Sequence, residues 1–199
     1  MPYWDPLPAA RAAETGPLPA PDGGTWLPDP VYGGCWNRRS DRWGERDWRN
    51  VPGPFYGAGT DSCWMGRLIA PANVLYEDER GAEFVYRQPR DVAETLAVLG
   101  AAAQDPMAGY ACDGDRHWTP ELVRDWWRER ARVREWAVRL DRSWSVSESG
   151  EEREAAGGAR EYVAHIDGGL ADQLRGYVFW LAEGRPARPG ESLPGLGGA

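Results

Sequence analysis

The sequence contains no lysine, only two histidines and only three cysteines in 199 residues. All 23 bases are therefore arginines, and the 31 acids outnumber them, which gives a formal net charge of −8 at pH 7. A general nucleic-acid binder needs a large positive surface to displace counterions from phosphates. The charge thus argues against a nucleic-acid partner and suits a protein whose partner is basic.

Long apolar runs are missing as well. No stretch approaches the roughly 18 apolar residues that a membrane-spanning helix needs. The first residues, MPYWDPLPAARAAETG, lack the basic start and apolar stretch of a secretory signal. Three widely spaced cysteines do not make a disulfide framework. We therefore expect a cytoplasmic protein without a membrane partner.

The two ends of the chain differ in composition from the middle. Residues 1–34 are rich in proline and glycine and show no helical or strand period, which predicts an arm of extended chain and turns. Residues 185–199 predict a mobile tail for the same reason. Residues 35–184 are expected to form a single domain between them. Three aromatic residues could pin the arm against that domain: Trp4, Trp26 and Tyr32.

Residues 61–88 are predicted to be rich in β-strand, because β-branched and aromatic residues come in short runs there. The segments 73–77 and 83–88 predict a hairpin, and Gly81 between them is placed to take a positive φ. The run MGRLIA (65–70) predicts a further strand.

Helices are predicted after the strands. Asp91 with Glu94 indicates the start of a helix over 91–104, with Val92, Leu96 and Leu99 on its buried face. The sequence Thr119-Pro120-Glu121 indicates the start of a second helix that runs to about residue 142. The buried stripe of this second helix would consist of Leu122, Trp126, Val133, Ala137 and Leu140.

The C-terminal third of the chain predicts a linker followed by two more helices. Residues 145–160 are polar and glycine-rich and predict a flexible linker. The helices are expected over 161–167 and 170–184, separated at Gly168-Gly169. The fold class is therefore predicted to be α+β, with a small antiparallel sheet and three to four packed helices. The twelve tryptophans mostly serve that core, since each can bury roughly 200 Å².

Few residues could carry out chemistry. An enzyme would use a site built from Asp61, Cys63, His117 or His165, with a histidine activating the thiol. A zinc site could draw on Cys112 and His117 with the other cysteines, but no CxxC pair is present. We therefore expect no metal and no cofactor. Asp113 and Asp115 are expected to shape a turn.

Arginine and tryptophan alternate in residues 38–49. In a basic protein this pattern is typical of a platform for single-stranded nucleic acid. The acids Asp41, Glu45 and Asp47 offset most of the positive charge here. We therefore expect a surface ribbon in which guanidinium groups stack on indole rings and pair with acids.

Three phrases resemble uncharacterised proteins of high-GC actinobacteria, some of which carry a ferredoxin label: GPFYGAGTDSCWMGR (53–67), APANVLYE (70–77) and EFVYRQP (83–89). An iron–sulfur cluster normally needs four clustered cysteines, so the cysteine count contradicts that label for this chain. The small, acidic and tryptophan-rich chain is also similar in type to immunity proteins of polymorphic toxin systems. Neither resemblance implies particular site residues.

The sequence therefore favours a protein-binding function. The hypothesis is an immunity protein that neutralises a basic toxin with nuclease, deaminase or ADP-ribosyltransferase activity, through electrostatic steering followed by aromatic anchoring. The alternatives are a small cytosolic enzyme and a structural or regulatory protein. The expected partner contacts are carboxylates on exposed loops: Glu77, Asp78, Glu79, Asp113 and Asp115.

Overall fold

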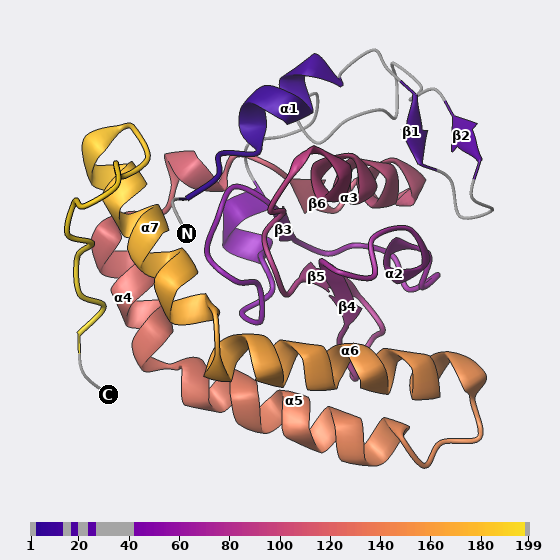
Figure 1. The fold of residues 1–199 in the computed structure, drawn as a ribbon. Coiled ribbons are helices and arrows are strands. Elements are labelled where there is room, and N and C mark those ends of the chain that lie inside the picture. Colours follow the sequence, from indigo (N-terminus) through magenta and orange to yellow (C-terminus); the bar gives the residue numbers. More distant parts are fainter. Residues whose placement is uncertain (1–2, 14–16, 20–23, 27–41, 198–199) are drawn as a thin grey trace. The chain divides into compact units, whose positions relative to one another are not determined.

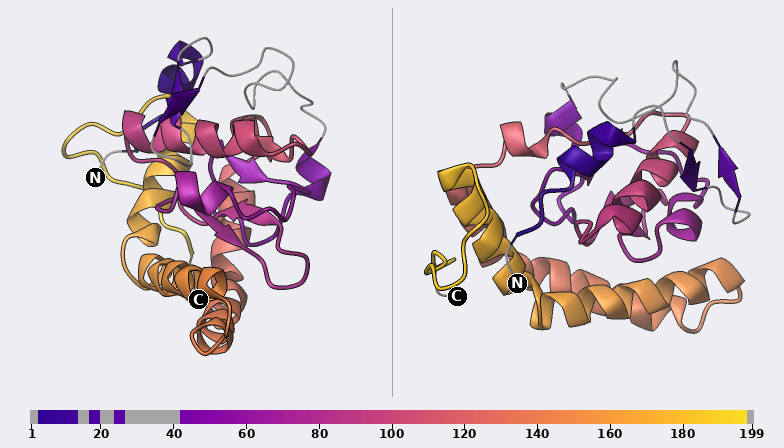
Figure 2. Two further views of the ribbon diagram at one scale, coloured as in Figure 1. Left: turned by 90° about the vertical axis from the view of Figure 1, so that its right-hand side faces the viewer. Right: turned by 45° about the horizontal axis from the view of Figure 1, so that its top comes forward.

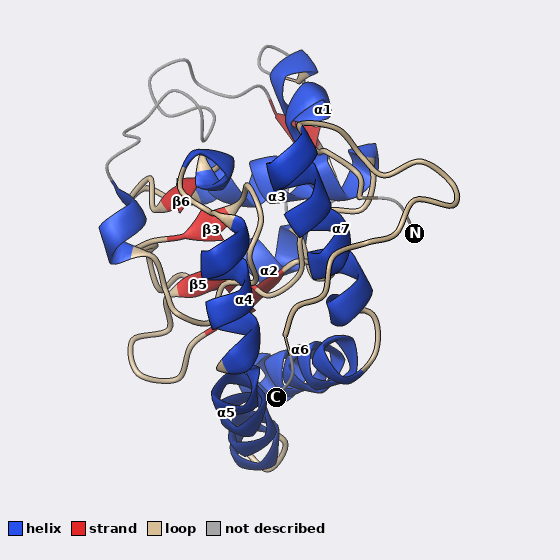
Figure 3. Cartoon of the chain, turned by 90° about the vertical axis from the view of Figure 1, so that its left-hand side faces the viewer, coloured by secondary structure: helices blue, strands red, loops and turns tan. Residues whose placement is uncertain are grey.

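The computed structural model describes residues 3–13, 17–19, 24–26 and 42–197 (Figure 1). It confirms the α+β class, with short antiparallel two-stranded sheets and, in these ranges, seven α-helices rather than three to four (Figure 3). None of the helices described is both long and apolar enough to cross a membrane. The chain divides into two compact units, a sheet unit of Pro6–Gly114 and a helical unit of Met1–Asp5 with Asp115–Ala199. The domain boundaries expected at residues 34 and 184 stay a prediction.

The predicted hairpin is confirmed in the sheet unit. Strand β4 (Val74–Tyr76) pairs antiparallel with β5 (Glu83–Val85), and Val74 lies opposite Val85. Gly81 takes a φ of 74° in the connecting turn, as its position predicts. A second short pair joins β3 (Tyr56–Gly57) to β6 (Tyr110–Ala111).

The strand predicted over 65–70 is wrong, because this run forms the short helix α2 (Gly66–Ile69). Its first N–H groups find acceptors on side chains of neighbouring strands: the Gly66 N–H donates to the Glu83 carboxylate and the Arg67 N–H to the Tyr76 hydroxyl. A side chain at position 66 would overlap Glu83 and the Tyr110 hydroxyl, so only glycine fits there. Hydrogen bonds to the surrounding side chains thus outweigh the β propensity of residues 65–70.

Helix α3 (Val92–Gln104) begins where the sequence predicts. The Asp91 side chain accepts from the Glu94 N–H at 2.9 Å, which is an N-cap hydrogen bond. The predicted buried face is shifted: Val92 in the first turn is 54% exposed. Leu99 is buried as predicted and Leu96 is partly buried against the same cluster, while Thr95 and Val98 are buried in place of Val92.

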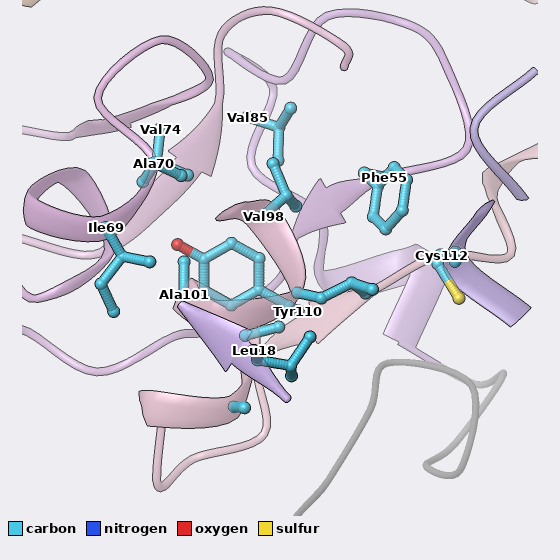
Figure 4. Packing of buried hydrophobic residues seen from close by; sticks show 14 residues of the cluster. Leu18, Phe55, Ile69, Ala70, Val74, Val85, Val98, Ala101, Tyr110 and Cys112 are labelled. Carbon is cyan, nitrogen blue, oxygen red and sulfur yellow. The ribbon is translucent and has the colours of Figure 1, made fainter. Parts of the chain in front are cut away.

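Part of the N-terminal arm belongs to the core of the sheet unit. It forms helix α1 (Leu7–Ala12) and strands β1 (Leu18–Pro19) and β2 (Thr25–Trp26), although the sequence predicts only extended chain and turns. Ala10 and Leu18 are fully buried in one cluster with residues of α3, and the Cys112 thiol lies in the same cluster (Figure 4). Tyr32 and the side chain of Trp26 lie outside the described residues.

Leucine 18 tests whether the arm stabilises the sheet unit. We expect Leu18→Ala to lower the free energy of unfolding by about 2 kcal/mol, at the low end for a buried leucine because the short arm can move inward to fill the space. Leu68→Ala, at a position 62% exposed, should change it by less than about 0.5 kcal/mol. Urea denaturation measures the free energy of unfolding of both variants. If Leu18→Ala lowers it no more than Leu68→Ala does, the arm contributes nothing to the stability of the sheet unit.

The first α-helix of the helical unit starts at the predicted cap, where the Thr119 hydroxyl accepts from the Leu122 N–H. The single helix predicted to residue 142 is divided at Glu129 into α4 (Pro120–Arg128) and α5 (Arg130–Trp144). Leu122 is exposed and does not share the buried stripe. The stripe is confirmed along α5 at Val133, Ala137 and Leu140.

The linker predicted over 145–160 is wrong, because helix α6 (Gly150–Asp167) begins there. Ser149 accepts from the Glu152 N–H, and Glu151 and Glu152 lie near the positive end of the helix dipole. Small buried residues at Ala155, Ala156 and Ala159 let α6 lie alongside α5, as Figure 2 shows. Packing thus overrides the low helix propensity of the glycines.

Helix α7 (Leu170–Glu183) follows a break at Gly168-Gly169 and ends at Gly184, whose φ is 66°. All of these features agree with the sequence prediction. The tail is joined to α7 by the Arg175 guanidinium, which donates to the carbonyl oxygens of Leu193 and Pro194. The predicted mobility of this tail stays a prediction.

Candidate functional site

The turn between β4 and β5 is organised around one carboxylate. The Glu77 side chain is 5% exposed and accepts hydrogen bonds from the backbone N–H groups of Glu79 at 2.7 Å, Arg80 at 2.7 Å and Ala82 at 3.0 Å. These are charge-assisted bonds, which are among the stronger hydrogen bonds in proteins. The turn therefore has one fixed conformation.

Two further acids stand at the tip of this turn and face solvent. The side chain of Asp78 is 43% exposed and that of Glu79 is 76% exposed. Their carboxylate oxygens lie 3.6 Å and 4.0 Å from one terminal nitrogen of Arg49. We call Asp78 and Glu79 the tip acids.

Arg49 is positioned by its neighbours in the chain, Asp47 and Trp48. Its guanidinium donates to the Asp47 carboxylate at 2.8 Å and stacks over the Trp48 ring at 4.5 Å. The Arg49 side chain is only 5% exposed, so its buried charge needs these carboxylate partners, and their attraction to it orients the tip acids. The result is a fixed anionic projection on the sheet unit.

The structure corrects the expected exposure of several other acids. Glu77 is buried and its oxygens are occupied by the turn, so it positions the tip acids and is not presented to a partner. Asp113 accepts from the Tyr56 hydroxyl at 2.7 Å, and Asp115 from the Tyr177 hydroxyl at 2.6 Å. Both are partly buried, one in each unit. A short 3₁₀ helix (Gly114–Arg116) follows Asp113, in keeping with the predicted turn.

The expected ribbon of arginine and tryptophan is present in residues 42–49. The Arg46 guanidinium lies 3.9 Å from the Trp43 ring centroid, which adds to the stacking of Arg49 on Trp48. The pairing of Arg49 with Asp47 offsets positive charge inside the ribbon. These contacts match the expected stacking and pairing, but the Arg49 side chain is only 5% exposed and does not lie on the surface. Residues 38–41 lie outside the described residues, and the absence of a nucleic-acid partner stays a prediction.

The predicted nucleophile does not have the surroundings that would activate it. Cys63 is exposed, and its hydrogen bond with Asp61 is the main cause of a raised thiol pKa, with further contributions from Glu83 and Asp105. A reactive cysteine needs positive neighbours that favour the thiolate. The carboxylates around Cys63 favour the thiol.

The remaining enzyme candidates lie in the other unit. His117 is in the segment between the short 3₁₀ helix and α4, and His165 is in the last turn of α6. Asp61 and Cys63 lie together in the sheet unit, where the Cys63 N–H donates to Asp61. Among these four residues, a hydrogen bond joins Asp61 and Cys63, and each unit contains only part of the predicted catalytic set.

Metal ligation has little support in the ranges that the structure describes. No group of three or more histidine, cysteine, aspartate or glutamate side chains that could hold a metal ion is found among those residues. Cys112 is buried in the apolar cluster, as expected for a small hydrophobic residue. Cys35, which the zinc alternative would use, lies outside the described residues.

The site has one member that the sequence analysis missed. Glu83 is 3% exposed, and its carboxylate accepts from the Gly66 N–H at 2.7 Å and from the Tyr110 hydroxyl at 2.6 Å. Burial is the main cause that raises the pKa of Glu83 to about 7. The only sequence signal is a glutamate inside a strand of otherwise apolar and aromatic residues, EFVY.

Comparison of the chain with protein-family models, with curated proteins and with solved structures finds no match.

The acidic surroundings of Cys63 lead to a reactivity prediction. Asp61→Asn removes the carboxylate that favours the thiol, so we expect Cys63 to react severalfold faster with iodoacetamide at pH 8. Mass spectrometry of the peptide that contains Cys63 measures the rate. Asp91→Asn, which removes an exposed acid elsewhere in the sheet unit, should leave the rate unchanged. If Asp61→Asn slows the reaction, the assignment of Asp61 is contradicted.

Proposed function

We propose that the protein binds and neutralises a basic protein partner in the cytoplasm, acting as an immunity protein toward a toxin domain with nuclease, deaminase or ADP-ribosyltransferase activity. The observation that carries this proposal is the fixed turn in which buried Glu77 displays the tip acids Asp78 and Glu79. The carboxylates would enter the positive active-site cleft that such a toxin uses to hold anionic substrates.

The net charge of −8 supports the same function. An acidic surface accelerates encounter with a basic partner and suppresses association with other acidic proteins. A turn that is already fixed before binding loses little conformational entropy on association. Steering by the whole chain and a preorganised contact at the tip would thus act together.

The enzyme alternative receives less support. A thiol nucleophile would need a lowered pKa, whereas the pKa of Cys63 is raised by Asp61. A structural or regulatory role remains an alternative that predicts no inhibition of any neighbouring gene product.

The test uses the purified full chain and the purified products of the genes adjacent to its own. We expect one product to bind with 1:1 stoichiometry and to lose its catalytic activity on binding. The double variant Asp78→Asn/Glu79→Gln should weaken binding by about tenfold or more, because two charge contacts are lost. Activity of the product is followed on its own substrate, such as plasmid DNA for a nuclease.

The matched control removes two exposed acids from the helical unit. Within the part of the chain that the structure describes, Glu121 and Asp125 on α4 each form one exposed ion pair inside the helix, so Glu121→Gln/Asp125→Asn has the same charge change and little effect on stability. The control should bind nearly as tightly as the wild-type chain. Absence of binding to every adjacent product, or equal loss in the two variants, would overturn the proposal.

A further inference from the structure

The C-terminal tail lies along α7 and α4 of the helical unit (Figure 1). The Arg175 guanidinium of α7 donates to the carbonyl oxygens of Leu193 at 3.3 Å and of Pro194 at 3.2 Å. The Arg124 guanidinium of α4 donates to the Gly195 carbonyl oxygen at 3.2 Å. Two arginines from different helices thus bind three consecutive carbonyl groups of a segment that has no helix or strand of its own.

Side chains of the same segment add selectivity. Leu196 is buried, whereas Gly195 before it is exposed. A Cβ added at position 195 would lie 4.0 Å from its nearest neighbour beyond the adjacent residues, so this position accepts other residues. Pro194 disfavours a helical backbone at Leu193, which reduces the entropy that the segment loses on docking. The surface therefore selects a Leu-Pro-x-Leu segment, with affinity from main-chain carbonyls and specificity from the leucine.

The two arginines are positioned by their own helices, independently of the tail. Arg175 lies 3.8 Å from the Asp172 carboxylate on α7, and Arg124 lies 3.5 Å from the Glu121 carboxylate on α4. The two helices pack on each other. Each guanidinium therefore keeps a carboxylate partner when the tail leaves, and a site built on helices is already formed before a ligand arrives.

An ion pair returns the tail to these helices. Arg185, which follows α7, donates to both oxygens of the Glu191 carboxylate at 2.7 Å and 2.8 Å, and its guanidinium lies 5.2 Å from the Phe179 ring centroid. The Arg188 N–H donates to the same carboxylate. We call the pair of Arg185 and Glu191 the clasp. Its side chains are 37% and 32% exposed, and such pairs contribute little stability, so the clasp opens readily.

The docked tail buries few side chains. Among residues 185–197, Leu196 is the buried one, and Leu193 and Pro194 are partly buried. A segment with few buried apolar contacts and solvent-exposed hydrogen bonds opens locally at a much smaller free energy than the core. The tail can therefore leave α4 and α7 while both helices stay folded.

We propose that the surface of α4 and α7 around Arg124 and Arg175 is a peptide-binding site for a Leu-Pro-x-Leu segment of a partner protein, and that the tail blocks this site in cis until the partner displaces it. The tail competes at an effective concentration on the order of millimolar, which weakens the apparent affinity for the partner segment. The site uses cationic groups of the helical unit, so it does not depend on the tip acids.

The test measures binding of a fluorescein-labelled peptide, GESLPGLGGA (190–199), to the full chain by fluorescence anisotropy. The first host carries Leu196→Asp, so that its own tail no longer fits the buried leucine position. We expect this host to bind the peptide, and the wild type to bind it about tenfold more weakly or less, because the intact tail competes. The same Leu196→Asp change placed in the peptide should abolish binding to both chains.

Arginine variants of this host locate the site. Arg124→Ala/Arg175→Ala removes the donors to the three carbonyl groups and should weaken peptide binding by about tenfold or more. The matched control, Arg139→Ala/Arg142→Ala, removes two exposed arginines of α5 and should leave the affinity unchanged.

A second host keeps Leu196 and opens the clasp instead. Glu191→Ala removes the partner of Arg185 without changing α4 or α7, so it should bind the peptide severalfold more tightly than the wild type does. Three results would each overturn the proposal: no binding to either host at millimolar peptide, equal affinity of wild type and Leu196→Asp, or equal loss in the two arginine pairs.

Discussion

Between pH 5 and pH 8, the free energy of unfolding of the wild type will fall by about 2.5 kcal/mol relative to that of Glu83→Gln. The cause is the pKa of the Glu83 carboxyl, which is about 7 in the folded chain, against an ordinary value of 4.5. The folded state therefore holds this proton more tightly than the unfolded state. The resulting stabilisation is fully present below pH 4.5 and is lost as pH rises through 7.

Urea denaturation at pH 5, 6, 7 and 8 measures this difference. Comparison with Glu83→Gln removes the contributions of all other titrating groups, because the two chains share them. Asp91→Asn, which removes an exposed acid of the same unit, should run parallel to the wild type over this range. Parallel curves for wild type and Glu83→Gln would contradict a pKa of this carboxyl that burial raises in the folded chain.

Replacement of Glu77 by alanine should cost about 3 kcal/mol of unfolding free energy. The substitution removes the acceptor of three backbone N–H groups in the turn, at Glu79, Arg80 and Ala82. Each charge-assisted bond contributes about 1.5–3 kcal/mol, but the freed N–H groups regain water at the surface, which reduces the total.

The control for this change is Glu79→Ala in the same turn. The Glu79 side chain is 76% exposed, so its removal should change stability by less than about 0.5 kcal/mol. Glu77→Gln should fall between the two, because one carbonyl oxygen remains as an acceptor. Urea denaturation together with hydrogen exchange of residues 79–82 measures the series. If Glu77→Ala and Glu79→Ala are equally mild, Glu77 does not organise the turn.

Elements with strong local signals were predictable from the sequence. The hairpin follows from two runs of β-branched and aromatic residues around Gly81, and α3 and α4 start at capping residues Asp91 and Thr119 that form the expected hydrogen bonds. These signals depend on residues within a few positions of one another, so no tertiary information is needed.

The errors arise where packing decides the structure. Helix α2 depends on acceptors from Glu83 and Tyr76, which are distant in sequence, and α6 depends on alanines that fit against α5. The same cause explains the site: Glu77 and the tip acids were found by residue type, whereas Glu83 was missed, and the buried state of Glu77 and Glu83 follows from the turn and strands around them. Exposure is a tertiary property that composition does not reveal.

The central claim is that a basic partner is recognised through the tip acids. The most direct measurement is the association rate constant between the chain and the adjacent gene product that it binds, over NaCl concentrations from about 50 to about 500 mM. We predict a steep fall with salt for the wild type and, for Asp78→Asn/Glu79→Gln, a slower association at low salt with a shallower salt dependence. Rate constants that coincide for the two chains at every salt concentration would contradict the claim.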